Sequence, residues 1–329
     1  MNNPLKKNFL HRRFKFLLTL LLILAFFLSL KCMGSPGEKK FKPKFSIKSI
    51  KLTHGQGRIV VGDINRVLNS FNNNETFEWL REHRPELISG EIRPLDNRIY
   101  DLELELLMEA NFLPPAFSLS LAASLFPFST KNESSLTYIY RTWRGDEINK
   151  FTFNPELRVW TPFRTGVSYL LLSISLINIR VNGGIEFHSA KFSENSRLVV
   201  TYTSGNTEWG GFYLKASQLF FGLQGGIELE LNLLRNFALV VEAEGSFAKL
   251  RNLKGELQCE HMNKGMYWEE KGSLWICNFW NNRFGARIHA FEISKGRPGG
   301  GIILKSDVRK AILDLSGYSF RIGARIRLF

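Results

Sequence analysis

The sequence of 329 residues lacks a run of roughly 20 apolar residues, the length that a membrane-spanning helix requires, which excludes a polytopic helical membrane protein. Cysteine and methionine are scarce, at three and five residues, and the 11 Pro and 27 Gly are too few for a collagen-like or low-complexity chain. A hydrophobic content of 44% also excludes a disordered chain. Aromatic residues are abundant instead, because the chain contains 28 Phe, an excess that favours β-structure or an aromatic-rich interface.

The first 34 residues have the pattern of an export signal. Five basic residues and no acid precede Phe16, and the apolar run Phe16–Leu30 is 15 residues long with only Ser and Thr as interruptions. Cys32 and Gly34 supply the small residues that precede a cut before Ser35, and Lys31 argues against lipidation of Cys32. Residues 1–34 are therefore predicted to be a cleaved signal peptide, followed by a periplasmic spacer over 35–45.

The net charge of +14 suggests a nucleic-acid partner at first sight. The predicted signal peptide contains six Lys and Arg and no acid, so its removal lowers the net charge to +8. Much of the basic excess thus belongs to the export signal, and we expect no nucleic-acid partner.

Long stretches of the mature chain alternate between apolar and polar residues. In 100–112 every even position is apolar or aromatic, while the odd positions include Asp101, Glu103, Glu105 and Glu109. The same pattern recurs in 117–125, 219–233, 237–247 and 318–328, and more weakly in 167–187. Such strands exceed the usual ~5 to 6 residues of globular sheets. They match the ~9 to 11 residues that cross a bilayer as a tilted strand.

The connections between these strands alternate in length. Tight turns are expected at Leu113–Pro115, Thr161–Gly166 and Arg235–Asn236, whereas 62–97, 128–150, 188–213 and 250–311 are long and polar. Short periplasmic turns and long extracellular loops are typical of a transmembrane barrel. A soluble, exported β-sandwich is the alternative, since its strands alternate as well.

We therefore predict an all-β fold, a transmembrane antiparallel up-and-down β-barrel over 46–329. Eight strands are expected, at 46–61, 98–112, 116–127, 136–160, 165–187, 212–233, 237–250 and 312–328. The number becomes ten if Asn281–Arg283 is a further tight turn. The first extracellular loop is predicted to contain a short helix, because Asp63 is a possible N-cap and Ile64, Val67, Leu68 and Phe71 have helical spacing.

Several segments resemble bacterial outer-membrane β-barrel proteins of the small porin-like type. They are Gly62-Asp63-Ile64-Asn65, Gly225-Gly226-Ile227-Glu228-Leu229, Val241-Glu242-Ala243-Glu244-Gly245 with Leu253-Lys254-Gly255, and the ending Ala311-Ile312-Leu313-Asp314-Leu315-Ser316-Gly317-Tyr318. The resemblance implies a location in the cell outer membrane. It also implies insertion by the barrel assembly machinery, which reads a terminal aromatic residue such as Phe329. We expect outer-membrane lipid and lipopolysaccharide as partners, and a monomer.

Turning the apolar faces outward places a set of charged side chains inside the barrel. These are Glu103, Glu105, Glu109, Glu228, Glu230, Glu242, Glu244, Arg321, Arg325 and Arg327, which Arg180 and ordered water can join. An eight-stranded barrel is just filled by side chains. The charges therefore predict a closed, salt-bridged lumen, with a cation path or proton-linked gate as the alternative that current steps in a planar bilayer would reveal.

Sites for other chemistry are sparse. Cys259 and Cys277 can form a disulfide in an oxidising compartment, worth about 3 kcal/mol, or remain free thiols. With His261 they lack a fourth metal ligand, so no metal is expected. Gly55 and Gly57 do not extend to a dinucleotide motif, because Val60 stands where the third glycine belongs, and no cofactor is expected.

Catalytic residues are not expected either. His188, beside Ser189 at the top of a strand, can serve as a base, but no acid that would orient it is identified in the sequence. The leading hypothesis is a non-enzymatic outer-membrane barrel with a plugged lumen, which acts in envelope structure or in surface interaction through its loops. The alternatives are a small porin-like channel for ions or hydrophobic solutes, and a lipid hydrolase active at the barrel rim.

The membrane location gives a first testable prediction. The mature protein should fractionate with the outer membrane, and its unheated form should migrate differently from the boiled form on a denaturing gel, because a closed barrel resists detergent. A soluble periplasmic product whose mobility does not change on heating would contradict the barrel.

Overall fold

The computed structural model describes residues 44–142, 145–261, 266–281, 286–298 and 305–328. The predicted signal peptide, most of the spacer and Phe329 lie outside these ranges. The chain forms two compact units, of which the smaller includes the described residues 44–46 and 110–113. The larger unit contains 47–109 and the described residues from 114 onwards, and the following description concerns that unit.

Nearly all elements are strands. The helices are α2 (Asp63–Asn72), α3 (Glu75–His83) and the 3-10 turn η1 (Pro85–Leu87). The strands are β1 (Phe45–Ile59), β2 (Ile88–Glu91), β3 (Arg98–Ala110), β4 (Phe117–Ser124), β5 (Phe128–Lys131), β6 (Ser134–Thr142), β7 (Gly145–Ile174), β8 (Ile177–Tyr202), β9 (Thr207–Leu234), β10 (Phe237–Phe247), β11 (Lys249–Arg251), β12 (Lys254–His261), β13 (Met266–Asn281), β14 (Ala286–Ser294), β15 (Lys305–Lys310), β16 (Ile312–Asp314) and β17 (Gly317–Arg327). The prediction of an all-β, antiparallel fold is confirmed, and both helices fall in the predicted helical segment.

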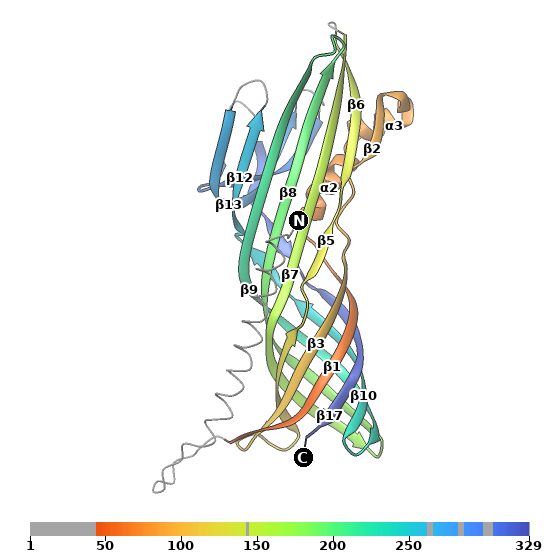
Figure 1. The fold of residues 1–329 in the computed structure, drawn as a ribbon, viewed down its shortest axis with the longest axis vertical. Coiled ribbons are helices and arrows are strands. Elements are labelled where there is room, and N and C mark those ends of the chain that lie inside the picture. The colour runs from red at the N-terminus through yellow and green to blue at the C-terminus, as the bar shows by residue number, and fades with distance from the viewer. Residues whose placement is uncertain (1–43, 143–144, 262–265, 282–285, 299–304, 329) are drawn as a thin grey trace, which may run out of the picture. The chain divides into compact units, whose positions relative to one another are not determined.

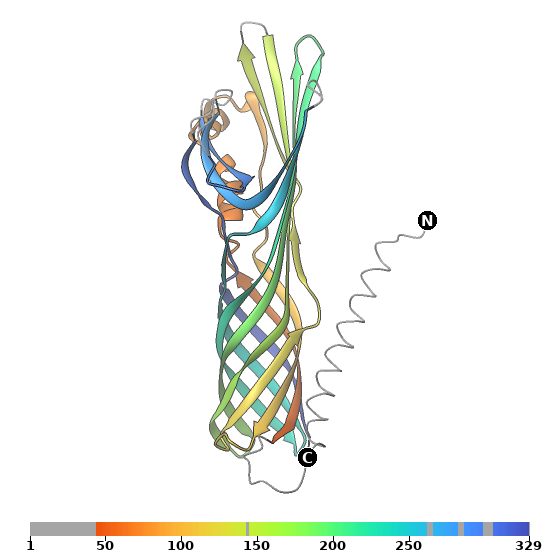
Figure 2. The same ribbon diagram turned by 90° about the vertical axis from the view of Figure 1, so that its left-hand side faces the viewer.

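Eight strands are paired in a ring. In order around the ring they are β1, β3, β4, β7, β8, β9, β10 and β17, and β17 pairs again with β1 over Ser49–Ile59. The strands of the ring cross one another obliquely in Figure 2. Among the described residues no helix is long and apolar enough to cross a membrane.

Three strands of the ring continue far beyond it. We call the continuing parts of β7, β8 and β9, with the elements packed on them, the extension (Figure 1). Along β8 the outward side chains are apolar up to Phe187 and then become polar with Lys191 and Arg197, while the inward side chains change from charged to apolar at Ala190 and Phe192. The ring therefore has an apolar exterior, and the extension has an apolar interior.

The apolar core of the protein lies in the extension. Phe192, Leu214 and Leu274 are almost fully buried there, and α2 packs its apolar face, including Leu68, into the same cluster. Asp63, at the start of α2, accepts two hydrogen bonds from Arg309, at 2.5 and 2.6 Å, and one from the backbone N–H of Ile312. This clamp fixes the helix to the strands that precede β17.

The predicted turn at Thr161–Gly166 is wrong. β7 passes straight through it and turns only after Ile174, into β8. Pro162 has no backbone N–H to donate, and the register between β7 and β8 shifts between Trp160 and Phe163, so a bulge absorbs the proline within a continuous strand. The predicted loop 188–213 is likewise mostly strand, since β8 extends to Tyr202 and β9 begins at Thr207.

The predicted disulfide is also wrong, because Cys259 and Cys277 are both free. Cys259 lies opposite Trp268 on β13, and Cys277 follows nine positions later on that strand. At ~3.3 Å per residue the two are about 30 Å apart along the strand, whereas a disulfide needs Cα atoms within about 7 Å. Cys277 instead donates to a carboxylate oxygen of Glu292 at 3.2 Å, and burial raises the pKa of the Cys259 thiol to about 11.

Glu194 is a buried acid in the extension. It lies inward on β8 opposite Leu214, and burial raises the pKa of its carboxyl to about 7, against a smaller opposing effect of a hydrogen bond with Ser196. The folded protein thus retains this proton at pH values where the unfolded chain releases it.

We predict that the extension loses stability as pH rises from about 4.5 to about 7, by roughly 3 kcal/mol at ~1.4 kcal/mol per pKa unit. Glu194→Gln should remove this loss, so that its urea midpoint in detergent micelles differs from wild type more at pH 8 than at pH 5. Glu260→Gln, at an exposed position of β12, is the control. Equal pH dependence in wild type and Glu194→Gln would contradict the assignment.

Candidate functional site

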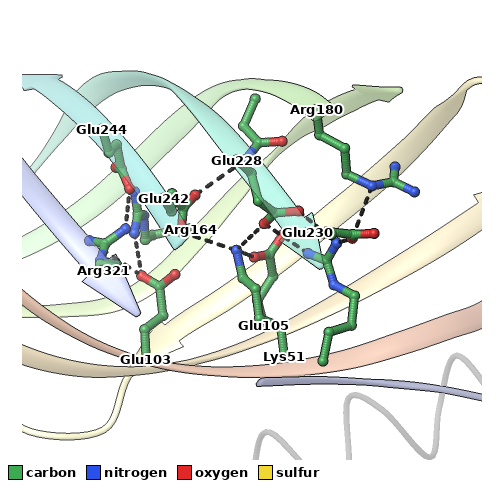
Figure 3. A network of polar contacts seen from close by, with 12 residues as sticks. Lys51, Glu103, Glu105, Arg164, Arg180, Glu228, Glu230, Glu242, Glu244 and Arg321 are labelled. Carbon is green, nitrogen blue, oxygen red and sulfur yellow. Dashed lines mark hydrogen bonds and ion pairs between the residues drawn. The ribbon is translucent and has the colours of Figure 1, made fainter. Parts of the chain in front are cut away.

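The interior of the ring contains two clusters of ionised side chains (Figure 3), which we call lower, nearer the β7–β8 turn, and upper, nearer the extension. In the lower cluster Lys51 Nζ contacts the carboxylates of Glu105, Glu228 and Glu242, the last two at 2.7 and 3.1 Å. Arg325 donates two hydrogen bonds to Glu228, at 2.6 and 2.9 Å. Lys51 and Arg325 are at most 1% exposed. Because water cannot reach them, the surrounding carboxylates must replace their hydration.

Glu230 completes the lower cluster. It forms ion pairs with Arg325, with Arg180 at 3.2 Å and with Arg327 at 3.0 Å, and it accepts a hydrogen bond from Asn178 at 2.9 Å. With this many donors, a fully buried carboxylate is satisfied without water.

The upper cluster is built around two arginines. Arg164 forms ion pairs with Glu103, Glu244 and Glu186, the last at 2.9 Å. Arg321 contacts Glu244 and Glu103 as well, and donates to Asp101 at 3.1 Å. Two guanidinium groups thus share the carboxylates of three ring strands, which ties the strands together across the lumen.

The predicted lumen residues do not all join these clusters. Glu109 pairs only with Lys48 among the described ion pairs, and both side chains are about 40% exposed at the end of the ring. Arg327 lies at the margin, with a quarter of its side chain exposed.

Sequence reasoning missed two central cations, Lys51 and Arg164. The signal for Lys51 is its odd position on β1, in the inward phase with Ser49 and Thr53. The inward position of Arg164 cannot be read from the pattern once 161–166 is taken as a turn, because a turn has no inward face.

A cavity of about 90 Å³ lies directly above the upper cluster. Its polar lining includes Asp101, Thr161, Arg164, Glu186 and His188, and much of its apolar lining comes from the upper ends of the ring strands β1, β3 and β17, with Ile59, Ile99, Tyr100 and Tyr318. Gly55 and Gly57 stand at inward positions of β1, where a Cβ would collide with Asp101 and Arg321 or with the Tyr318 carbonyl oxygen and Ser319, so no larger residue fits there.

His188 is held in this cavity by three neighbours. Its Nδ1 lies 3.0 Å from Thr161 Oγ1, and its Nε2 lies 3.1 Å from a carboxylate oxygen of Glu186, two residues earlier on the same face of β8. The ring stacks on Phe220 at 5.0 Å, and Gly222 leaves room for it, since a Cβ there would lie 3.2 Å from Nε2. The imidazole therefore has a fixed position beside a carboxylate.

Three buried nitrogen atoms of cavity-lining residues lack a hydrogen-bond partner among the described residues. They are His188 Nε2, Arg164 Nε and Arg321 Nε. His188 Nε2 is close to Glu186 but is not aligned with it for a hydrogen bond. All three atoms are inaccessible to water, so the polar character of the cavity comes from the other charged and hydroxyl groups of the residues that line it.

Comparison with known proteins finds similar chains among solved structures. No family model matches the sequence, and no curated protein matches it either. Among solved structures, the outer membrane protease OmpT from Escherichia coli is similar, with 88% of this chain and 99% of that chain covered at 7% identity and a TM-score of 0.28. A similarity of this size does not assign an activity, and it does not support the narrower small porin-like resemblance.

The expectation of a non-enzymatic protein is corrected by these findings. It rested on the missing acid beside His188, and the structure places Glu186 at 3.1 Å. A plugged lumen that acts only through its loops is therefore not the function we pursue.

The charge clusters generate a prediction about stability. Lys51→Met should destabilise the protein by about 3 to 5 kcal/mol, because three buried carboxylates lose their shared cation. Lys48→Met, which removes a half-exposed pair with Glu109, should cost less than about 1 kcal/mol. Urea midpoints of the two variants measure the difference, and similar midpoints would show that the network is not needed for stability.

Proposed function

We propose that the protein is an eight-stranded outer-membrane β-barrel that hydrolyses acyl bonds at the outer boundary of the membrane. The membrane assignment is supported by the apolar exterior of the ring, where Phe221, Ile227 and Ile322 are each about 60 to 70% exposed. The long strands β7, β8 and β9 then place the extension outside the cell. Export by the predicted signal peptide, insertion by the barrel assembly machinery and a monomeric state belong to the same proposal.

The observation that supports hydrolysis is the arrangement of His188 with Glu186 and the cavity. In the tautomer in which Nε2 carries the proton and faces the Glu186 carboxylate, Nδ1 has a lone pair that can accept the proton of the Thr161 hydroxyl. The adjacent Glu186 carboxylate favours the imidazolium that results, as an acid that orients and stabilises a catalytic histidine does.

The reaction is a transfer of an acyl group to water. The Thr161 hydroxyl passes its proton to Nδ1 of His188 as it takes one from a water in the cavity, the water oxygen bonds to the acyl carbon, and the carbonyl oxygen becomes an oxyanion. The positive charges of Arg164 and Arg321, which line the cavity, stabilise that oxyanion. The bond to the leaving group then breaks, and the proton on Nδ1 passes through the Thr161 hydroxyl to the leaving group.

His188→Ala should lower kcat about 10²- to 10⁴-fold, the usual contribution of a general base. Glu186→Gln should lower it less, since the imidazole remains in place. The assay uses purified protein in micelles with a chromogenic fatty-acyl ester and, separately, a fluorogenic peptide amide, so that the type of acyl bond is identified.

His83→Ala, at an exposed position on α3, is the matched control and should keep wild-type activity. Wild-type protein that cleaves neither probe, or a His188→Ala variant as active as wild type, would refute the proposed function.

A further inference from the structure

The wall of the ring changes between β3 and β4 at the level of the cavity. Pairing of the two strands ends at Glu103 and Ser124, and one more hydrogen bond follows, from the Leu125 N–H to the Leu102 carbonyl at 2.7 Å. Beyond it the chain enters β5, which pairs with β7 instead of β3. Above this point the edge of β3 that faced β4 therefore has no strand paired with it in the described pairings.

A second set of bonds closes the wall again further up. The side-chain amide of Asn132 donates to the carbonyls of Arg93 and Pro94, at 2.8 and 3.2 Å. Between this contact and the Leu125–Leu102 bond lies a stretch of wall without strand pairing between 98–101 and 126–131 in the described pairings. We call this stretch the window.

Aromatic side chains surround the window. Tyr100 and Phe126 are 54% and 52% exposed, and both line the cavity that contains His188, as does the partly buried Phe128. Tyr318 lines the same cavity from β17, with 53% exposure. Exposed aromatic residues at the edge of an apolar belt are typical of the membrane interface of a barrel.

The depth of the window in the membrane indicates what can enter it. Outward side chains change from apolar to polar just above Phe187, so the hydrocarbon boundary of the proposed barrel passes at the level of His188. The ester bonds of membrane lipids lie at that boundary, between the acyl chains and the headgroups. A cavity of about 90 Å³ is smaller than the ~150 Å³ cavity that holds benzene, so it admits one slim group rather than a folded peptide.

We propose that the window admits an acyl chain of an outer-leaflet lipid sideways from the membrane and brings its ester bond to His188. The substrate is then a membrane amphiphile with esterified acyl chains, either a phospholipid or a lipopolysaccharide. The identity of the substrate rests on the proposed hydrolase, but the entry of the chain does not, and the two can be tested separately.

The test uses the full mature protein carrying His188→Ala, reconstituted in vesicles, with a photoreactive phenylalanine analogue at one position. At position 128 the analogue faces the cavity, and at position 320 it lies on the lipid-facing side of β17. Phospholipid vesicles and vesicles with added lipopolysaccharide are irradiated in parallel, and the mass of each adduct identifies the lipid.

Both positions should form lipid adducts, and Phe126→Asp should reduce the yield at position 128 severalfold while leaving position 320 unchanged. Adducts at 320 without adducts at 128 would overturn lateral entry and leave the hydrolase intact. Adducts at 128 in a wild-type protein that hydrolyses nothing would support entry and refute the hydrolase. Adducts at neither position would refute the membrane barrel, and lateral entry with it.

Discussion

The compensation of buried carboxylates inside the ring is the constraint on which the rest of the structure depends. Glu103, Glu105, Glu228, Glu230, Glu242 and Glu244 are all almost inaccessible to solvent. Ionised carboxylates at such positions are tolerated only with cations and hydrogen-bond donors in contact. Lys51, Arg164, Arg321 and Arg325 supply them from three strands, β1, β7 and β17. The ring can thus have a charged interior and an apolar exterior, the reverse of a soluble sheet.

That reversal also determines where the cavity can form. Below His188 the interior is filled by ion pairs, and above it by the apolar core of the extension. The two kinds of filling do not pack against each other fully, and a cavity of about 90 Å³ remains between them. The cavity is therefore a boundary between two packing regimes.

Much of the ring could be predicted from alternation, since period-2 patterns identify the inward face of β3, β9, β10 and β17 directly. Lys51 could not be identified with the same ease, because the alternation of β1 is irregular around Gly55 and Gly57. The segment 161–166, which contains Pro162, is predicted to be a turn, and only the pairing of β7 with β8 reveals a bulge in a continuous strand. The inward position of Arg164 therefore could not be predicted. The pair Glu186 and His188, two positions apart on one strand face, was readable in the sequence and was overlooked.

The length of β8 has a mechanical consequence. Its register with β9 continues from Ile177–Leu231 to Thr201–Thr207 without a shift, so no hinge separates the hairpin tip from His188. A partner that tilts the tip of the β8–β9 hairpin therefore also moves the lower part of β8. The imidazole of His188 moves with β8 relative to Arg164 on β7. Force applied at the tip of the β8–β9 hairpin is transmitted along the hydrogen-bonded ladder to the level of the cavity.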